Sequence, residues 1–130
     1  MSGVVVAAPI AVLVFRGLAV AALAGVAIQF FLAGMTVFGA GTGWETHAAM
    51  GGALGLPVIG LFLMSLSRGL RAYRRSAGLL LAVYLIQVML AALGSVVPML
   101  GALHPVNGLL MALITFQLVR RLTPRNGGSF

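Results

Sequence analysis

The chain contains no cysteine, no lysine and no aspartate, and Glu45 is its one acidic residue. Without cysteine there is no disulfide, no thiolate metal site and no covalent haem attachment through thioether bonds. A single carboxylate rules out paired-carboxylate catalysis, the lack of aspartate rules out a Ser-His-Asp triad, and the lack of lysine rules out a P-loop. We therefore expect the chain to have no catalytic activity of its own.

Long apolar runs make up most of the sequence. Of its 130 residues, 62% are hydrophobic and 7% are charged, against about 45–50% and about 25% in an average soluble domain. The runs cover approximately residues 17–38, 47–66, 77–97 and 103–121, close to the ~20 residues that a helix needs to cross a bilayer. Because the runs are continuous and not alternating, they favour helices over barrel strands. The sequence predicts an all-α membrane protein, a single domain (1–130) with four transmembrane helices in an up-down-up-down bundle.

The basic residues are distributed unevenly. Four arginines lie between the second and third runs, Arg16 precedes the first run, and three more lie at or after the end of the fourth, whereas the other two connections have none. Since basic residues stay on the cytoplasmic side, we expect an integral protein of the plasma (inner) membrane with both termini in the cytoplasm. The same rule accounts for the net charge of +7. We therefore do not expect nucleic acid as a partner. The expected partner is the lipid bilayer, and other membrane subunits or a homo-oligomer remain open.

The first two runs resemble the last two. Gln29 precedes His47 by 18 residues, and Gln87 precedes His104 by 17. The chain has three glutamines and two histidines, so matching both at nearly one spacing predicts an internal repeat of a helical hairpin, with the two copies parallel. Both histidines then lie near the outer ends of the second and fourth helices.

A small residue follows each histidine after four positions and so shares its helix face. In an up-down-up-down bundle the second and fourth helices are diagonal neighbours, so two imidazoles can face each other above a slot lined by small residues. Neutral imidazole is a good ligand for haem iron, and one interpretation of the pattern is a bis-imidazole haem b site. The candidate residues are the metal ligands His47 and His104 and the cofactor-binding residues Gln29, Gly51, Gln87 and Gly108.

A cofactor-free interpretation uses the same residues. His104 precedes Pro105 and lies where a helix can begin, and His47 lies among polar residues at the membrane surface. Small-residue stripes are also ordinary close-packing devices, and glutamines hydrogen-bond between helices. The outer side offers no basic residue to pair haem propionates. In this alternative the chain is a structural or accessory subunit of a larger respiratory or transport complex in the membrane.

The run Gln29-Phe-Phe-Leu-Ala-Gly-Met-Thr-Val37, followed by Trp44 and His47, resembles the helix pairs of the haem A synthase family. In that family each half is a four-helix bundle with haem-ligating histidines on its second and fourth helices. The resemblance implies that His47 and His104 are ligands and that Gln29 and Gln87 are polar residues of the preceding helices. Haem A synthase has two such bundles and a catalytic acid that has no clear counterpart here, so we do not expect haem A synthesis.

The whole chain also resembles a family of small actinobacterial four-helix membrane proteins of unknown function. The shared features are the Gln-x-x-Leu-Ala-Gly run, the histidine that opens the second span, and His104-Pro-Val-Asn-Gly108. This resemblance covers all four spans and implies no activity. The two main hypotheses are therefore a cytochrome b-like protein or haem carrier and a cofactor-free subunit. A third, a transporter that works as a dimer, is weaker because no charged residue lies at mid-membrane.

Overall fold

The computed structural model describes residues 9–41 and 43–123. Its elements are the helices α1 (Pro9–Val37), α2 (Trp44–Ala53) and α3 (Gly55–Ser65), the short 3₁₀ helix η1 (Arg68–Tyr73), and the helices α4 (Arg74–Gly94) and α5 (Pro98–Leu122). Four apolar helical segments are long enough to cross a bilayer: Pro9–Val37, Trp44–Ser65, Arg68–Gly94 and Pro98–Leu122. The prediction of an all-α membrane protein with four spans is confirmed.

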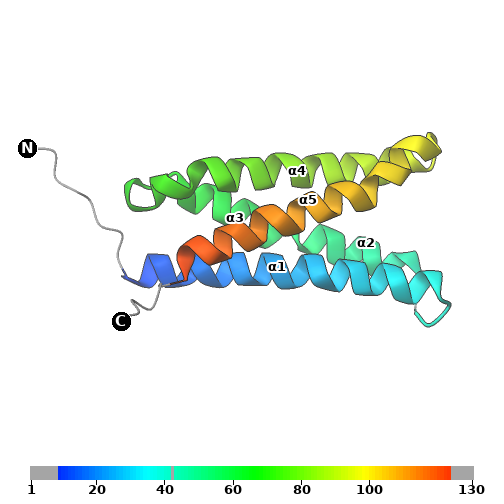
Figure 1. Cartoon of the computed structure of the whole chain (residues 1–130), viewed down its shortest axis with the longest axis horizontal. Helices are drawn as coiled ribbons and strands as arrows, with labels where there is room; N and C mark the ends of the chain where they lie inside the picture. The colour runs from blue at the N-terminus through cyan, green and yellow to red at the C-terminus, as the bar shows by residue number, and fades with distance from the viewer. Residues whose placement is uncertain (1–8, 42, 124–130) are drawn as a thin grey trace, which may run out of the picture.

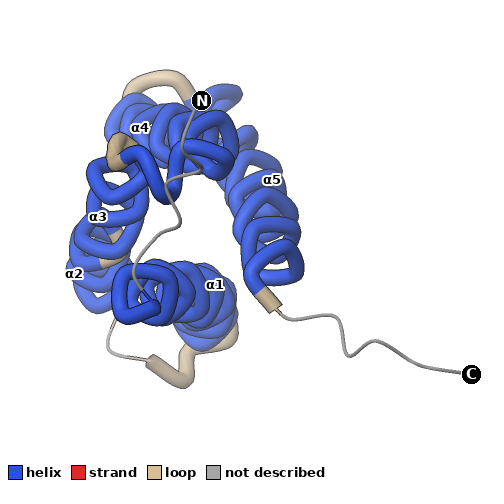
Figure 2. Tube along the Cα trace, turned by 90° about the vertical axis from the view of Figure 1, so that its left-hand side faces the viewer, coloured by secondary structure: helices blue, strands red, loops and turns tan. Residues whose placement is uncertain are grey.

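The four spans run up, down, up and down along one axis (Figure 1). Seen end-on, they follow one another around a ring in which α1 packs against α2, α3 and α5, and α4 packs against α3 and α5 (Figure 2). The second span and α5 are therefore diagonal neighbours, as predicted. Figure 1 also shows that the α1–α2 hairpin and the α4–α5 hairpin diverge toward the end that holds their connecting loops.

Buried side chains concentrate toward the other end of the bundle. The buried residues of α1 follow one another at steps of four and three, which makes a single stripe on the helix: Phe15, Ala19, Ala22 and Val26. The buried residues of α5 begin at Gly108 and continue to Leu122, and α2 has no buried residue at all. The bundle is thus closely packed near the start of α1, the end of α5 and the α3–α4 connection. It is more loosely packed toward the two hairpin loops.

A tight turn ends α1 and returns the chain into the second span. The N–H of Gly39 donates to the carbonyl of Thr36 at 3.2 Å, and the N–H of Ala40 donates to that of Met35 at 2.8 Å. This pair of bonds is the Schellman motif, which needs a left-handed residue, and Gly39 has a φ of 71°. Because the reversal is short, the start of α2 lies directly beside the end of α1.

The second span is broken between α2 and α3 at Leu54. Pro57 lies one turn further on and has no N–H, so it removes one helical hydrogen bond and crowds the preceding turn. The hydroxyl of Tyr84, from α4, lies 3.1 Å from the carbonyl oxygen of Gly51 and 3.4 Å from that of Gly52. The break is therefore the place where α4 hydrogen-bonds to the backbone of the second span.

α5 begins earlier than the predicted fourth span. We expected a start near residue 103 with His104 and Pro105 at the opening, but the helix starts at Pro98 and Val97 is its N-cap. Pro98 occupies the first turn, which accepts proline because the first N–H groups of a helix have no partner there. His104 lies inside the helix, so the interpretation that a helix begins at His104 and Pro105 is wrong. α1 likewise starts before the predicted residue 17, at Pro9, and ends at Val37.

Candidate functional site

The two histidines lie together between the hairpins. His47 comes from α2 and His104 from α5, and the centroids of their rings are 6.0 Å apart with the ring planes inclined by 60°. Both side chains are half-buried. On its other side, the ring of His47 meets that of Trp44 at 5.5 Å in an edge-on contact. The structure thus brings together the two residues that the spacing singled out.

Each imidazole is anchored to the preceding helix of its own hairpin in the same way. Nδ1 of His47 lies 3.2 Å from the backbone carbonyl oxygen of Gln29, and Nδ1 of His104 lies 3.1 Å from that of Gln87. A carbonyl oxygen only accepts, so Nδ1 is the protonated nitrogen in both rings and Nε2 carries the lone pair. Metal-ligating histidines are typically held by such a bond from the ring nitrogen that does not bind the metal.

The glycines that follow the histidines contact the side chains of the same glutamines. A Cβ at Gly51 would lie 3.6 Å from Oε1 of Gln29, and a Cβ at Gly108 would lie 3.3 Å from Nε2 of Gln87 and 3.4 Å from the ring of Phe30. The sequence repeat therefore recurs as the same contacts in space. The slot that we expected beneath the histidines is filled, because the glutamine side chains lie over the glycines.

Asn107 makes the two hairpins different, and the sequence analysis did not single it out. Its Nδ2 donates to the carbonyl of Val83 at 2.9 Å and to Oε1 of Gln87 at 2.7 Å. Nε2 of Gln87 in turn lies 3.1 Å from Nε2 of His104. Asn107 follows His104 by three residues and so shares its helix face, which is the signal that could have identified it.

The first hairpin lacks this extension of the network. Met50 stands at the position that corresponds to Asn107, and a thioether offers no N–H to a glutamine. Nε2 of Gln29 is buried and has no hydrogen-bond partner in the described part of the chain. The two halves of the site therefore share their histidine anchors and differ in how the glutamine amides are used.

The segments that carry the described arginines lie at the end of the bundle opposite the α1–α2 loop (Figure 1). The described arginines belong to the start of α1, to η1, to the start of α4 and to the end of α5: Arg16, Arg68, Arg71, Arg74, Arg75, Arg120 and Arg121. Glu45 lies in the first turn of α2, at the loop end. Arg125 lies outside the described residues. The described part of the histidine end thus has no basic side chain to pair with a carboxylate.

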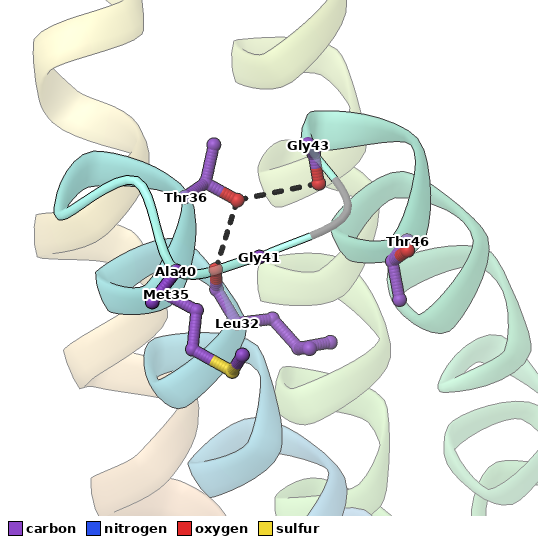
Figure 3. Close-up of a pocket in the computed structure, with 7 residues that line it drawn as sticks. All are labelled: Leu32, Met35, Thr36, Ala40, Gly41, Gly43 and Thr46. Carbon is purple, nitrogen blue, oxygen red and sulfur yellow. Dashed lines mark hydrogen bonds between the residues drawn. The ribbon is translucent and has the colours of Figure 1, made fainter.

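A pocket of about 450 Å³ opens beside the α1–α2 loop (Figure 3). The hydroxyl of Thr36 lies 3.0 Å from the carbonyl oxygen of Leu32 and 3.2 Å from that of Gly43, which ties the loop to the end of α1. The lining side chains carry no titratable group: Leu32, Met35, Thr36, Ala40, Gly41, Gly43 and Thr46. The pocket includes neither histidine and brings no acid, base or metal ligand to the site.

The paired imidazoles are a donor set of two. Among the residues that the structure describes, no group of three or more histidine, cysteine or acidic residues gathers to hold a metal ion. Haem iron has four ligands from its own macrocycle and takes axial ligands from the protein. Two metal–nitrogen bonds of about 2 Å, together with two ring radii, span roughly 6 Å, which matches the observed separation of 6.0 Å. The separation of the rings is therefore compatible with two axial ligands, and such ligation would require the amide of Gln87 to leave Nε2 of His104.

Fold and site together define a small α-helical protein that spans the membrane four times, with a paired-imidazole centre between two similar hairpins. The family of unknown function DUF6220 matches residues 29–95, just over half of the chain, and the chain belongs to this family. The match includes Gln29, His47 and Gln87 and ends before His104. No curated protein and no solved structure is significantly similar to the chain. Membership of a family of unknown function is thus confirmed, and the resemblance to haem A synthase stays a prediction.

Proposed function

We propose that the chain is a small cytochrome b-like membrane protein that binds haem b through His47 and His104 and serves electron transfer or haem handling. The observation that carries the proposal is the anchored pair of imidazoles. Their ring centroids lie 6.0 Å apart, and each Nδ1 is held by a backbone carbonyl of the preceding helix. Two oriented neutral imidazoles on facing helices of a bundle are the arrangement that haem iron uses for axial ligation.

Each residue of the site has a distinct part in this proposal. His47 and His104 would hold the haem iron through Nε2, and the carbonyls of Gln29 and Gln87 fix the tautomer of the rings and raise their basicity. Gly51 and Gly108 leave room for the glutamine side chains above them. Bound haem would supply reversible one-electron chemistry. α2 has no buried residue, so its adjustment around a flat group costs little core packing.

The proposal includes an orientation in the plasma membrane. The described arginines gather at the bundle end away from the α1–α2 loop, and basic residues are retained on the cytoplasmic side. The histidine pair then lies toward the extracytoplasmic side, with both termini in the cytoplasm. A redox partner or a haem acceptor would approach from that outer side.

A second candidate function is that of a cofactor-free accessory subunit in a larger membrane complex. Two observations favour it: Nε2 of His104 already faces the amide of Gln87, and no described basic side chain lies at the histidine end to pair with haem propionates. In this role the imidazoles and glutamines stabilise each hairpin by hydrogen bonds between its helices. Such bonds contribute about 0.6 kcal/mol each on average in membranes.

The absorption spectrum of the protein, purified from cells with an ample haem supply, separates the two functions. We expect a low-spin bis-imidazole spectrum that His47→Ala and His104→Ala each abolish, because the chain has no further histidine to replace either ligand. Gln117→Leu is the matched control, since Gln117 is exposed on α5 and should leave the spectrum unchanged. A colourless wild-type protein with intact helical circular dichroism contradicts the haem proposal and favours the accessory role.

A further inference from the structure

The amides of Asn107 and Gln87 distinguish the two histidines. We propose that they form a latch that caps Nε2 of His104, so that His47 is the ready ligand and His104 the conditional one. This inference rests on the proposed function in treating the two imidazoles as ligands of one group. It adds a control of that site by Asn107, which acts through the amide of Gln87.

The direction of every hydrogen bond in the latch follows from one carbonyl. The oxygen of Val83 can only accept, so the Asn107 atom 2.9 Å from it is the nitrogen Nδ2. That nitrogen also lies 2.7 Å from Gln87, whose facing atom is therefore the acceptor Oε1. Gln87 then turns its Nε2 donor to His104, whose Nε2 accepts at 3.1 Å. The chain of bonds closes where Nδ1 of His104 donates to the carbonyl of Gln87.

The latch occupies the lone pair that a metal needs. Imidazole binds a metal through its unprotonated nitrogen, which in His104 is the nitrogen that accepts from Gln87. In the first hairpin Met50 replaces Asn107, and the amide nitrogen of Gln29 is buried without a partner. Within the described residues, His47 hydrogen-bonds through Nδ1 to the carbonyl of Gln29, and no amide caps its Nε2.

The consequence is an order of events at the site. His47 can bind an incoming group at once, whereas ligation by His104 requires Gln87 to turn away and to give up its bond to the ring. Interhelical hydrogen bonds of this kind change equilibria in membranes by roughly 3- to 15-fold. Because the chain can cap His104 again with its own amide, the site suits a group that is passed on. The latch therefore favours haem handling over permanent retention of haem.

Two substitutions open the latch without touching a ligand. Asn107→Met copies the residue of the first hairpin, and Gln87→Leu removes the cap itself while the backbone carbonyl that anchors Nδ1 remains. Gln117→Leu is again the control. The haem-free readout is the nitrogen NMR spectrum of the full chain in lipid nanodiscs with ¹⁵N-labelled histidine. We expect the Nε2 resonance of His104 to move toward that of a free lone pair in both variants, while the resonances of His47 stay in place.

The second readout is titration with haem b. We expect both variants to bind haem roughly 3- to 15-fold more tightly than the wild type, with a larger low-spin fraction, and Gln117→Leu to match the wild type. A His104 resonance that is unchanged in both folded variants overturns the latch, as does haem binding that is no tighter once the cap is released. If no form of the protein binds haem and the His104 resonance still moves, the cap is supported and the haem function is not.

Discussion

At the scale of single residues, the site is organised by carbonyls and amides without any charged group. Glu45 is the one acidic side chain in the sequence, and the imidazoles are oriented by the backbone carbonyls of Gln29 and Gln87. A carbonyl fixes the tautomer as a carboxylate does, but it adds no negative charge inside the membrane, where charge is expensive. The Nδ1 bonds therefore leave Nε2 as the lone-pair nitrogen of each ring, and in His104 that nitrogen accepts from the amide of Gln87.

The glycines beside the glutamines provide a residue-scale prediction. Gly51→Leu places a side chain where the amide of Gln29 now lies, 3.6 Å from the position of a Cβ. A Cβ at Gly52, the next residue, would meet nothing within 4 Å. We expect Gly51→Leu to lower the free energy of unfolding by about 1–3 kcal/mol, as overpacking does, and Gly52→Leu to leave it nearly unchanged. Thermal unfolding of the purified protein in detergent measures both, and equal stability of the two variants contradicts the contact.

Some of the site could be predicted from the sequence because it depends on spacing. The repeated separation of Gln29 from His47 and of Gln87 from His104 sets which residues meet, since helix geometry converts spacing into position. The conformation and contacts of the glutamine side chains could not be predicted. They depend on rotamers that are chosen by tertiary neighbours, such as Asn107 and Phe30, so the slot expected beneath the histidines is occupied.

At the scale of the elements, the second span is built from two helices joined at a break. α2 carries His47 and has no buried residue, whereas α3 contributes Val58 and Leu61 to the core. Tyr84 hydrogen-bonds to the backbone next to the break. Besides the bond from His47 to the carbonyl of Gln29, this contact from α4 therefore helps to hold α2, which has no buried residue.

Removal of the Tyr84 hydroxyl tests that contact. Tyr84→Phe keeps the ring and loses the bonds to the carbonyls of Gly51 and Gly52, so we expect a loss of about 0.6–1.7 kcal/mol in the free energy of unfolding. Tyr73→Phe is the control, because the ring of Tyr73 stacks on Phe15 at 5.4 Å and phenylalanine preserves that contact. Chemical denaturation followed by circular dichroism compares the two. A Tyr84→Phe protein as stable as the control would show that the break needs no hydroxyl.

The existence of the elements was easier to predict than their ends. Continuous apolar runs predict four spans because a helix needs about 20 apolar residues to cross the hydrocarbon core of a bilayer. Four such helical segments are present among the described residues. The start of α5 at Pro98 and the break at Leu54 depend on local backbone chemistry. Proline is accepted in the first turn of a helix, as at Pro98, and Pro57 follows the break at Leu54. Pro105, by contrast, lies inside α5 without ending it. A helix start and a helix break can both lie inside a hydrophobic run, and the hydropathy of the run does not reveal either one.

At the scale of the whole molecule, charge and packing are arranged along the same axis. The arginine end holds most of the buried core, and the hairpins diverge toward the end with the histidines (Figure 1). Because of this unequal packing, the arginine end contributes most to stability, and the histidine end can change conformation more easily. Helices in the loosely packed half can move with the loss of few buried contacts. A site that admits or releases a group requires such movement.

The orientation of the bundle in the membrane is the prediction that belongs to this scale. Reporter fusions near residue 72 should be active on the cytoplasmic side and those near residues 43 and 99 on the outer side, because the arginines flank residue 72 and the other two connections carry none. Replacing Arg71, Arg74 and Arg75 with glutamine should weaken this preference, whereas Arg16→Gln alone should not. An alkaline phosphatase fusion reports the outer side, and a green fluorescent protein fusion at the same residue reports the inner side. Cytoplasmic fluorescence from a fusion at residue 43 would reverse the assignment and move the histidine pair to the inner leaflet.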